Sequence, residues 1–218
     1  MPFYNELLTI ALSKGRLLSE TLRVLQSKGI EISDYSIDSR KLCFEINEKK
    51  LRFILVKPVD VLLWIEKGFA DLGIVGNDLL LEKGKDFVEL FDLGIGKCKI
   101  CICVKPGVNI KDVKSVASKY PNITKKFFDK QAQHIDIIHL NSSVEVAPML
   151  NIADCIVEIV QSGKTLEENG LMIYDTIEEI STKIIKKQKY SYEKEVQINE
   201  FLTNLKNDSY KNKISFSV

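Results

Sequence analysis

The feature that most constrains this chain is an alternation of short apolar segments with segments of helical pattern. Residues 8–12, 72–75 and 155–160 have the length and composition of buried strands. Residues 17–27 and 122–130 instead have the pattern of helices. Because strands that alternate with helices form parallel connections, the chain is predicted to have an α/β fold with mostly parallel sheets.

The alternation restarts after Pro106-Gly107, which predicts two subdomains. We expect residues 1–104 and 181–206 to form a discontinuous subdomain I, and residues 105–180 to form subdomain II. Residues 207–218 have the composition of a polar tail. Ligands of α/β folds bind outside the carboxyl ends of strands, so we expect the active site in the cleft between the subdomains.

The composition is that of an ordinary soluble globular protein. Of the 218 residues, 45% are hydrophobic and 28% charged, and the net charge is +1. This balance provides no general basic field that would hold nucleic acid. No secretory signal is visible, and no segment approaches the roughly 20 apolar residues of a membrane span. We therefore expect a cytoplasmic chain without a nucleic-acid or membrane partner.

Three of the five cysteines form a C-x-x-C-x-C cluster that invites a metal interpretation. Cys98, Cys101 and Cys103 lie in an apolar segment that has the pattern of a strand. A strand would send Cys101 and Cys103 to one face and Cys98 to the other. Neither a second cysteine pair nor a nearby histidine completes a tetrahedral site, so we expect core cysteines.

Residues 154–166 carry the strongest local signal for a ligand. A predicted strand holds Asp154 and Glu158, which alternation would place on one side. The turn that follows it and opens a helix consists of Ser162, Gly163, Lys164, Thr165 and Leu166. Its backbone N–H groups, its hydroxyls and the helix N-terminus could bind a phosphate. The spacing is not that of a Walker A motif, and a plain strand-to-helix connection remains an alternative.

Several other polar side chains occur at the ends of predicted strands. Lys14-Gly15-Arg16 follows the first strand, Arg40 precedes a strand, and Lys57 closes another. Each cation alone reads as a surface charge, but strand ends converge in α/β folds, which favours an anion site. Glu145 opens a predicted helix, where it could favour the helix dipole or accept sugar hydroxyls.

Read together and in order, these motifs resemble the ATP phosphoribosyltransferase family, which catalyses the first step of histidine biosynthesis. The resemblance covers about residues 8–205 and includes 12–16, 39–42, 68–78, 92–98, 119–122, 143–148 and 154–170. The length resembles the short form of the family. The resemblance implies two α/β subdomains similar to type II periplasmic binding proteins. It also implies Mg²⁺-dependent attack of adenine N1 of ATP on 5-phosphoribosyl 1-pyrophosphate, which releases pyrophosphate.

The resemblance also implies roles for individual residues. The catalytic and anion-binding cations would be Arg16, Arg40 and Lys57, with Lys14 and Gly15 beside them. The 162–166 turn would bind the phosphoribosyl phosphate. Glu145, Asp154 and Glu158 would lie near the ribose or metal, and Asp92 near the purine. Mg²⁺ would be held mainly by the substrate phosphates. The implied assembly is a homodimer within a hetero-oligomer that contains a regulatory subunit similar to histidyl-tRNA synthetase.

Some positions depart from the pattern of the family. Lys57 replaces an arginine, Glu158 an aspartate and Ser162 a threonine, while Leu62 replaces a proline. Ser142 and Asn151 replace glycines. These departures keep open two alternatives: a non-catalytic two-lobed module that binds an anion or nucleotide, and a degenerate subunit.

Overall fold

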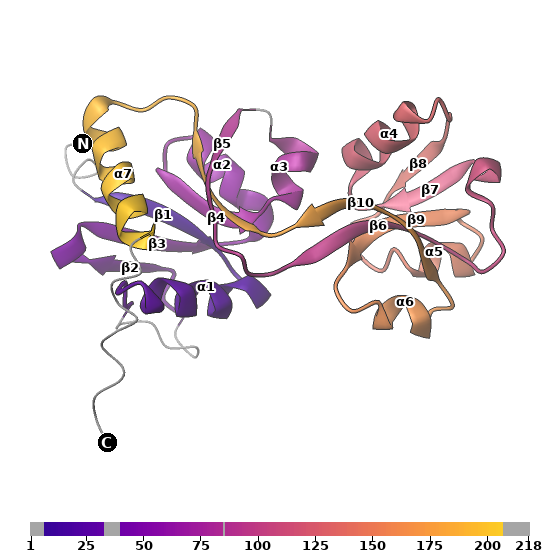
Figure 1. Ribbon diagram of the computed structural model, residues 1–218, viewed down its shortest axis with the longest axis horizontal. Helices are drawn as coiled ribbons and strands as arrows, with labels where there is room; N and C mark the ends of the chain where they lie inside the picture. The colour runs from indigo at the N-terminus through magenta and orange to yellow at the C-terminus, as the bar shows by residue number, and fades with distance from the viewer. Residues whose placement is uncertain (1–6, 33–39, 85, 207–218) are drawn as a thin grey trace, which may run out of the picture. The chain divides into compact units, whose positions relative to one another are not determined.

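The computed structural model describes residues 7–32, 40–84 and 86–206, which form two compact units (Figure 1). The first unit contains the described residues up to Asn77, then Gly84–Gly96, then the described residues from Ser181 onward. The second unit contains Asp78–Lys83 and Lys97–Ile180. The expected organisation into two α/β units is confirmed.

The first unit is built on a mixed sheet with the strand order β2-β3-β1-β4-β11-β5. Its strands are β1 (Leu8–Ser13), β2 (Cys43–Ile46), β3 (Leu51–Val56), β4 (Leu72–Gly76), β5 (Phe87–Asp92) and β11 (Thr182–Lys187). Its helices are α1 (Arg16–Ser27), α2 (Val61–Glu66) and α7 (Tyr192–Lys206), with the short 3-10 helices η1 (Asn47–Lys49) and η2 (Pro58–Asp60).

Helices cover both faces of this sheet. Apolar residues of α1 and α7, such as Leu25 and Phe201, join one buried cluster with Ile10 and Phe53 of the strands. On the other face α2 packs against β4. A Cβ atom added to Gly73 would lie 2.5 Å from Val61 Cγ1, so a glycine is needed where helix and strand meet.

The strand directions bring six strand ends to one edge of the first sheet. β1 pairs parallel with β3 and β4, whereas β2 runs antiparallel to β3, and β11 antiparallel to β4 and β5. The carboxyl ends of β1, β3, β4 and β5 therefore lie beside the amino ends of β2 and β11. We call this the cationic edge, after Lys14, Arg16, Arg40 and Lys57, which follow or precede these strand ends.

The second unit has a mixed sheet with the order β10-β6-β9-β7-β8. Its strands are β6 (Cys98–Val104), β7 (Ser115–Ser118), β8 (Asp136–His139), β9 (Cys155–Val160) and β10 (Met172–Ile180). Its helices are α3 (Asp78–Lys83), α4 (Pro121–Lys130), α5 (Val146–Met149) and α6 (Lys164–Glu168), with the 3-10 helix η3 (Ile110–Asp112). Figure 1 shows α4 and α6 above and below the strands of this unit.

The three clustered cysteines lie in the core of the second unit, as the sequence predicts. Cys101 and Cys103 belong to the buried cluster on one face of the sheet, and Cys98 belongs to the cluster on the other. Cys155 is also fully buried. Burial raises the pKa values of the Cys103 and Cys155 thiols to about 12, so both remain protonated near neutral pH.

Three features differ from the sequence expectation. Residues 98–104 were expected in subdomain I, but β6 pairs with β9 and β10 in the second sheet, and the chain divides after Gly96. β11 was not anticipated, because Lys183, Lys186 and Lys187 interrupt its apolar pattern. The sheets are mixed rather than mostly parallel, because β2, β6, β10 and β11 join them in antiparallel pairs.

Side chains explain why α3 belongs to the second unit. The buried Glu82 carboxylate accepts hydrogen bonds from the backbone N–H groups of Asn122 and Ile123, at 2.9 and 3.0 Å. These N–H groups belong to the first turn of α4, where a helix offers them no carbonyl acceptor of its own. Across the described ranges, no helix is long and apolar enough to cross a membrane.

Candidate functional site

The loop after β1 supplies three of the expected residues. Lys14 donates its backbone N–H to the Val56 carbonyl at 2.8 Å, which joins the loop to the end of β3. Gly15 has φ 95° and space around its Cα, and Arg16 begins α1. Because φ values in this range favour glycine, Gly15 lets the chain turn from strand to helix between two cations.

The strand register brings further cations beside this loop. Ser13 of β1 pairs with Val56 of β3, so Lys14 is level with Lys57. The antiparallel β2–β3 pairing, extended by a hydrogen bond from Leu55 N–H to the Leu42 carbonyl, brings the amino end of β2 beside the end of β3, and Arg40 precedes β2 by three residues. Lys57 and Arg40 are exposed. The cationic edge thus presents Lys14, Arg40 and Lys57 at the ends of three neighbouring strands.

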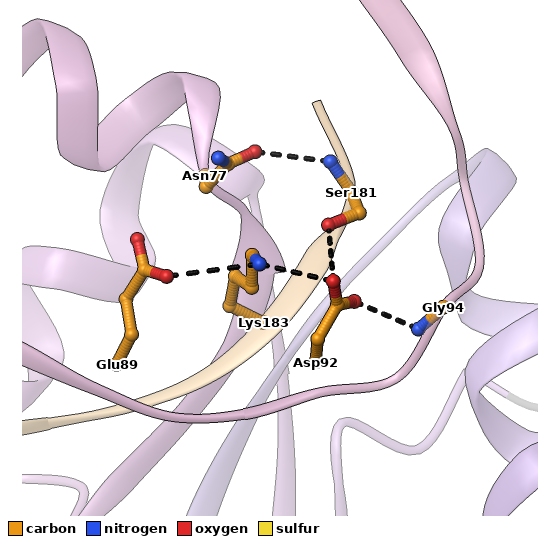
Figure 2. Close-up of polar contacts among 6 residues, drawn as sticks. All are labelled: Asn77, Glu89, Asp92, Gly94, Ser181 and Lys183. Carbon is orange, nitrogen blue, oxygen red and sulfur yellow. Dashed lines mark hydrogen bonds and ion pairs between the residues drawn. The ribbon is translucent and has the colours of Figure 1, made fainter. Parts of the chain in front are cut away.

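Asp92 ends β5 at the same edge and is held by three donors (Figure 2). Its Oδ1 accepts the Gly94 N–H at 2.8 Å, and its Oδ2 accepts the Ser181 hydroxyl at 2.9 Å and Lys183 Nζ at 3.0 Å. Ser181 is itself held, because its N–H donates to Asn77 Oδ1 at 3.0 Å. Burial alone would raise the pKa of Asp92, but the Gly94, Lys183 and Ser181 donors outweigh it and lower that pKa.

The second unit gathers all of its expected residues except Asp154 at one edge as well. β7, β8 and β9 are parallel, so their carboxyl ends lie together. The turn after β9 contains Gly163, with φ 79° and space around its Cα, before α6 begins at Lys164. Ser162 and Thr165 are exposed, whereas the Leu166 side chain is buried in the core. Leu166 can therefore offer a ligand only its backbone.

Glu158 lies two residues before the end of β9, in a cluster of acidic groups. Desolvation raises its pKa, and the nearby Glu145 and Asp78 raise it further, while the Ile159 N–H and Lys119 lower it. Glu145 is half-buried and precedes α5. We call the turn 162–166 with Glu145 and Glu158 the acidic edge.

Lys119, Asp78 and Tyr120 belong to this neighbourhood, although the sequence analysis assigned them no role. The Tyr120 hydroxyl donates to Asp78 Oδ2 at 3.2 Å. Desolvation raises the pKa of Asp78, against the lowering effects of Tyr120 and Lys119. Lys119 directly follows β7, as Lys14 follows β1 and Lys57 follows β3.

Asp154 lies away from the acidic edge. It precedes β9, four residues before Glu158, which is about 13 Å along a strand. Its Oδ2 accepts the backbone N–H groups of Lys114 and Ser115 and the Ser115 hydroxyl at 2.8–3.0 Å. The Lys114 N–H is the main cause that lowers the pKa of Asp154. These bonds hold the amino end of β7, so Asp154 has a role in the fold.

One departure from the family pattern has a structural explanation. Asn151, which replaces a glycine, has φ 53°, and its side-chain oxygen accepts Lys105 Nζ at 3.2 Å. Asparagine tolerates the left-handed conformation better than other non-glycine residues do. The substitution therefore preserves the turn after α5.

The described residues contain no group of three or more His, Cys, Asp or Glu side chains that could hold a metal ion. The nearest arrangement is Glu145 with Glu158, two carboxylates close enough for one to raise the pKa of the other. This pair fits Mg²⁺, which is commonly bound by one or two carboxylates together with substrate phosphates.

Comparison with known proteins gives concordant results. The family model described as HisG: ATP phosphoribosyltransferase matches residues 57–207. The chain is 47% identical over 179 residues to the ATP phosphoribosyltransferase of Oceanobacillus iheyensis, covering 81% of this chain and 86% of the relative. It is 43% identical over 180 residues to that of Geobacillus sp., covering 82% and 87%.

Solved structures extend the comparison to the fold. A chain of the "ATP phosphoribosyl transferase (HisG:HisZ) complex from Thermotoga maritima" matches with TM-score 0.78 and 30% identity, covering 91% of this chain and 96% of that one. The periplasmic VFT2 domain of Bordetella pertussis BvgS matches with TM-score 0.58 and 10% identity, covering 94% and 90%. The second match concerns the fold alone and agrees with the expected likeness to periplasmic binding proteins. On the family model and the curated relatives, this chain belongs to the ATP phosphoribosyltransferase family.

Proposed function

We propose that this chain condenses ATP with 5-phosphoribosyl 1-pyrophosphate, giving N1-(5-phosphoribosyl)-ATP and pyrophosphate in the first step of histidine biosynthesis. The observation that carries the proposal is the convergence of Lys14, Arg40 and Lys57 at neighbouring strand ends, in a chain of this family. Such an edge suits substrates that carry several phosphate groups.

The chemistry needs fixed charge more than it needs a base. Adenine N1 is unprotonated near neutral pH and forms the new bond to the anomeric carbon with its own electron pair. The bond from that carbon to pyrophosphate breaks, and its electron pair leaves with the pyrophosphate. Arg16, Arg40 and Lys57, assisted by Lys14, would stabilise the charge that develops on this leaving group. Lys57 keeps a positive charge but lacks the two-pronged donor geometry of arginine.

The acidic edge is proposed to bind the phosphoribosyl group. The 162–166 turn offers backbone N–H groups and two exposed hydroxyls, at Ser162 and Thr165, to the 5-phosphate. Glu145 and Glu158 would accept hydrogen bonds from the ribose hydroxyls. Asp92, at the cationic edge, would contact the purine. We leave Asp154 out of the site, because it is engaged with the start of β7.

Mg²⁺ is proposed as the cofactor, bound mainly by substrate phosphates. Glu145 and Glu158 are the residues of the acidic edge that would contribute oxygen ligands to it. When bound, Mg²⁺ would neutralise part of the phosphate charge, which adds to the effect of the fixed cations.

We further propose that the chain works as the catalytic subunit of a hetero-oligomer. The Thermotoga maritima structure to which it is similar is titled as a HisG:HisZ complex. The expected partner is the regulatory subunit similar to histidyl-tRNA synthetase, with this chain present as a homodimer. A cytoplasmic location fits the use of ATP as a substrate.

A turnover assay tests the proposal. The purified chain would be mixed with ATP, 5-phosphoribosyl 1-pyrophosphate, Mg²⁺ and a pyrophosphatase, and phosphoribosyl-ATP would be detected by mass spectrometry. Product from the chain alone would establish the transferase. If product formed only after addition of the regulatory subunit, the chain would be a catalytic subunit that depends on its partner. Absence of product in both cases would favour a binding module or a degenerate subunit.

A further inference from the structure

The pairing of β5, the strand that ends at Asp92, is irregular. In the pairing of β11 with β5, Lys183 lies opposite Asp92 and Ile185 lies opposite Glu89, with a register shift between them. Leu90 is thus the additional residue of a β-bulge in β5. Bulges often lie next to active sites, where they change the direction of a side chain.

The bulge places two carboxylates on the side of one lysine. Glu89 and Asp92 are three residues apart, so they would face opposite sides of a regular strand. Because Leu90 is inserted between them, Lys183 Nζ lies 3.0 Å from Asp92 Oδ2 and 3.7 Å from Glu89 Oε2. Figure 2 shows the Lys183 ammonium between these two acids.

The hydrogen bonds leave Asp92 with capacity for one more donor. A carboxylate has about four lone-pair sites. Three are used by Gly94, Ser181 and Lys183, and two of these donors bind Oδ2. Oδ1, which accepts only the Gly94 N–H among these bonds, keeps a site. The Asp92 side chain is 46% exposed and can be reached by a ligand, whereas the Lys183 side chain is 18% exposed and faces the two acids.

We infer that Lys183 is a positioning residue of the purine site, which holds Asp92 as an oriented, charged acceptor for the exocyclic amino group of adenine. This inference rests on the proposed function, in which Asp92 contacts the purine. Lys183 does not touch the substrate and acts through Asp92. Ser181, fixed by Asn77, supports the same carboxylate oxygen from a second direction.

The arrangement gives a reason for a fixed carboxylate at this position. When N1 uses its electron pair to bond to the anomeric carbon, the adenine ring becomes positively charged. Part of that charge spreads to the exocyclic nitrogen, which becomes a stronger donor. A carboxylate already oriented toward this nitrogen stabilises the transition state more than the ground state.

A double-mutant cycle tests whether Lys183 acts through Asp92. We expect Lys183→Met to lower kcat/KM for ATP about tenfold, since hydrogen bonds to charged groups contribute at that level. The KM for 5-phosphoribosyl 1-pyrophosphate should remain unchanged. In an Asp92→Asn background, Lys183→Met should cause little further loss. Lys183→Arg, which keeps the charge, should recover part of the activity.

Matched variants make the test specific. Lys125→Met removes an ion pair of equal length, 3.0 Å to Asp129, on the exposed surface of α4, and should leave all constants unchanged. Ser181→Ala removes one neutral donor from the same carboxylate and should cause a smaller loss of the same kind. It replaces Lys183→Met in the cycle if that variant does not fold.

Two results would overturn the inference. One is an equal loss of kcat/KM for ATP and for 5-phosphoribosyl 1-pyrophosphate in Lys183→Met. The other is a double variant whose loss of kcat/KM equals the sum of the two single losses in free energy. The wild-type chain separates this inference from the proposed function. If wild type forms no product with or without the partner, the proposed function fails. Calorimetric ATP binding then decides the inference, which requires a weaker affinity for ATP in Lys183→Met than in wild type and in Lys125→Met.

Discussion

The cationic edge and the acidic edge use the same backbone geometry for different purposes. Both contain the carboxyl ends of parallel strands followed by short loops, and the cationic edge also includes the amino ends of β2 and β11. The cationic edge presents Arg16, Arg40 and Lys57 as exposed side chains. The acidic edge instead carries the half-buried Glu145 and Glu158, with a glycine turn beside them. Long flexible cations suit a departing pyrophosphate, whereas a fixed turn with carboxylates suits a sugar phosphate held in one position.

The largest expected loss of turnover comes from removing a cation of the cationic edge. Arg16→Met should lower turnover by about 10²–10³-fold, the usual result of removing a group that stabilises transition-state charge. Arg23→Met is the matched control, because Arg23 lies on the same helix and is exposed. Steady-state kinetics of both variants would check this. If Arg23→Met lost as much turnover as Arg16→Met, the effect would belong to α1 and not to the site.

The glycine turn of the acidic edge comes next. Gly163→Ala forces a side chain into a left-handed conformation, which costs about 1–2 kcal/mol of stability, and it disturbs the phosphate turn. We expect about a tenfold rise in the KM for 5-phosphoribosyl 1-pyrophosphate, as for a lost hydrogen bond to a charged group. Gly170, which follows α6, has a similar φ of 67° and similar space around its Cα, so Gly170→Ala controls for backbone strain. A rise of equal size in Gly170→Ala would remove the turn from the phosphate site.

Substitutions of Lys57 test how much the cationic edge depends on the geometry of its hydrogen-bond donors. Lys57→Ala should lower turnover about tenfold, whereas Lys57→Arg should preserve or raise it, since arginine can contact two phosphate oxygens together. The measurement is kcat at saturating concentrations of both substrates. An alanine variant with unchanged kcat would take Lys57 out of the mechanism.

Substitution of Asp154 tests whether this residue lies outside the substrate site. Asp154→Asn should lower the free energy of unfolding by about 1 kcal/mol near pH 7, a value kept small because the side chain is exposed. The folded-state pKa of Asp154 is depressed, so its stabilisation is present above the unfolded pKa and lost as pH falls through the folded pKa. Denaturant unfolding should therefore show the two proteins converging in acid. A raised KM for 5-phosphoribosyl 1-pyrophosphate would restore Asp154 to the site.

Glu158 should show the opposite pH dependence, with the smallest effect. Its folded-state pKa is raised, so its contribution is present below the unfolded pKa and lost as pH rises through the folded pKa. Glu158→Gln, which stays neutral, should gain stability relative to wild type between acid and neutral pH. Unfolding curves across this range would check the sign, and a gap that shrinks with rising pH would contradict the placement of Glu158.

Local pattern determined which segments are strands and helices and which residues stand at strand ends. The apolar runs that form β1, β4 and β9 are visible directly, and so are the turns that contain Gly15 and Gly163. β11 was missed because its two buried isoleucines, Ile184 and Ile185, are flanked by three lysines, and a short strand with so many charges has no distinctive period.

Tertiary structure decided which of these ends meet. Strand order and direction are set by contacts between residues far apart in the chain, and local sequence does not encode them. β6 was placed in the wrong unit for that reason, and Asp154, which is close to Glu158 in the sequence, precedes β9 and lies near the amino end of that strand. Lys183 lies 91 positions from Asp92 and meets it only because β11 returns beside a bulged β5. The sequence by itself determined the family and the polar residues that stand at strand ends, and only the packed sheets decided which of these residues lie together, because strand order depends on contacts between distant segments.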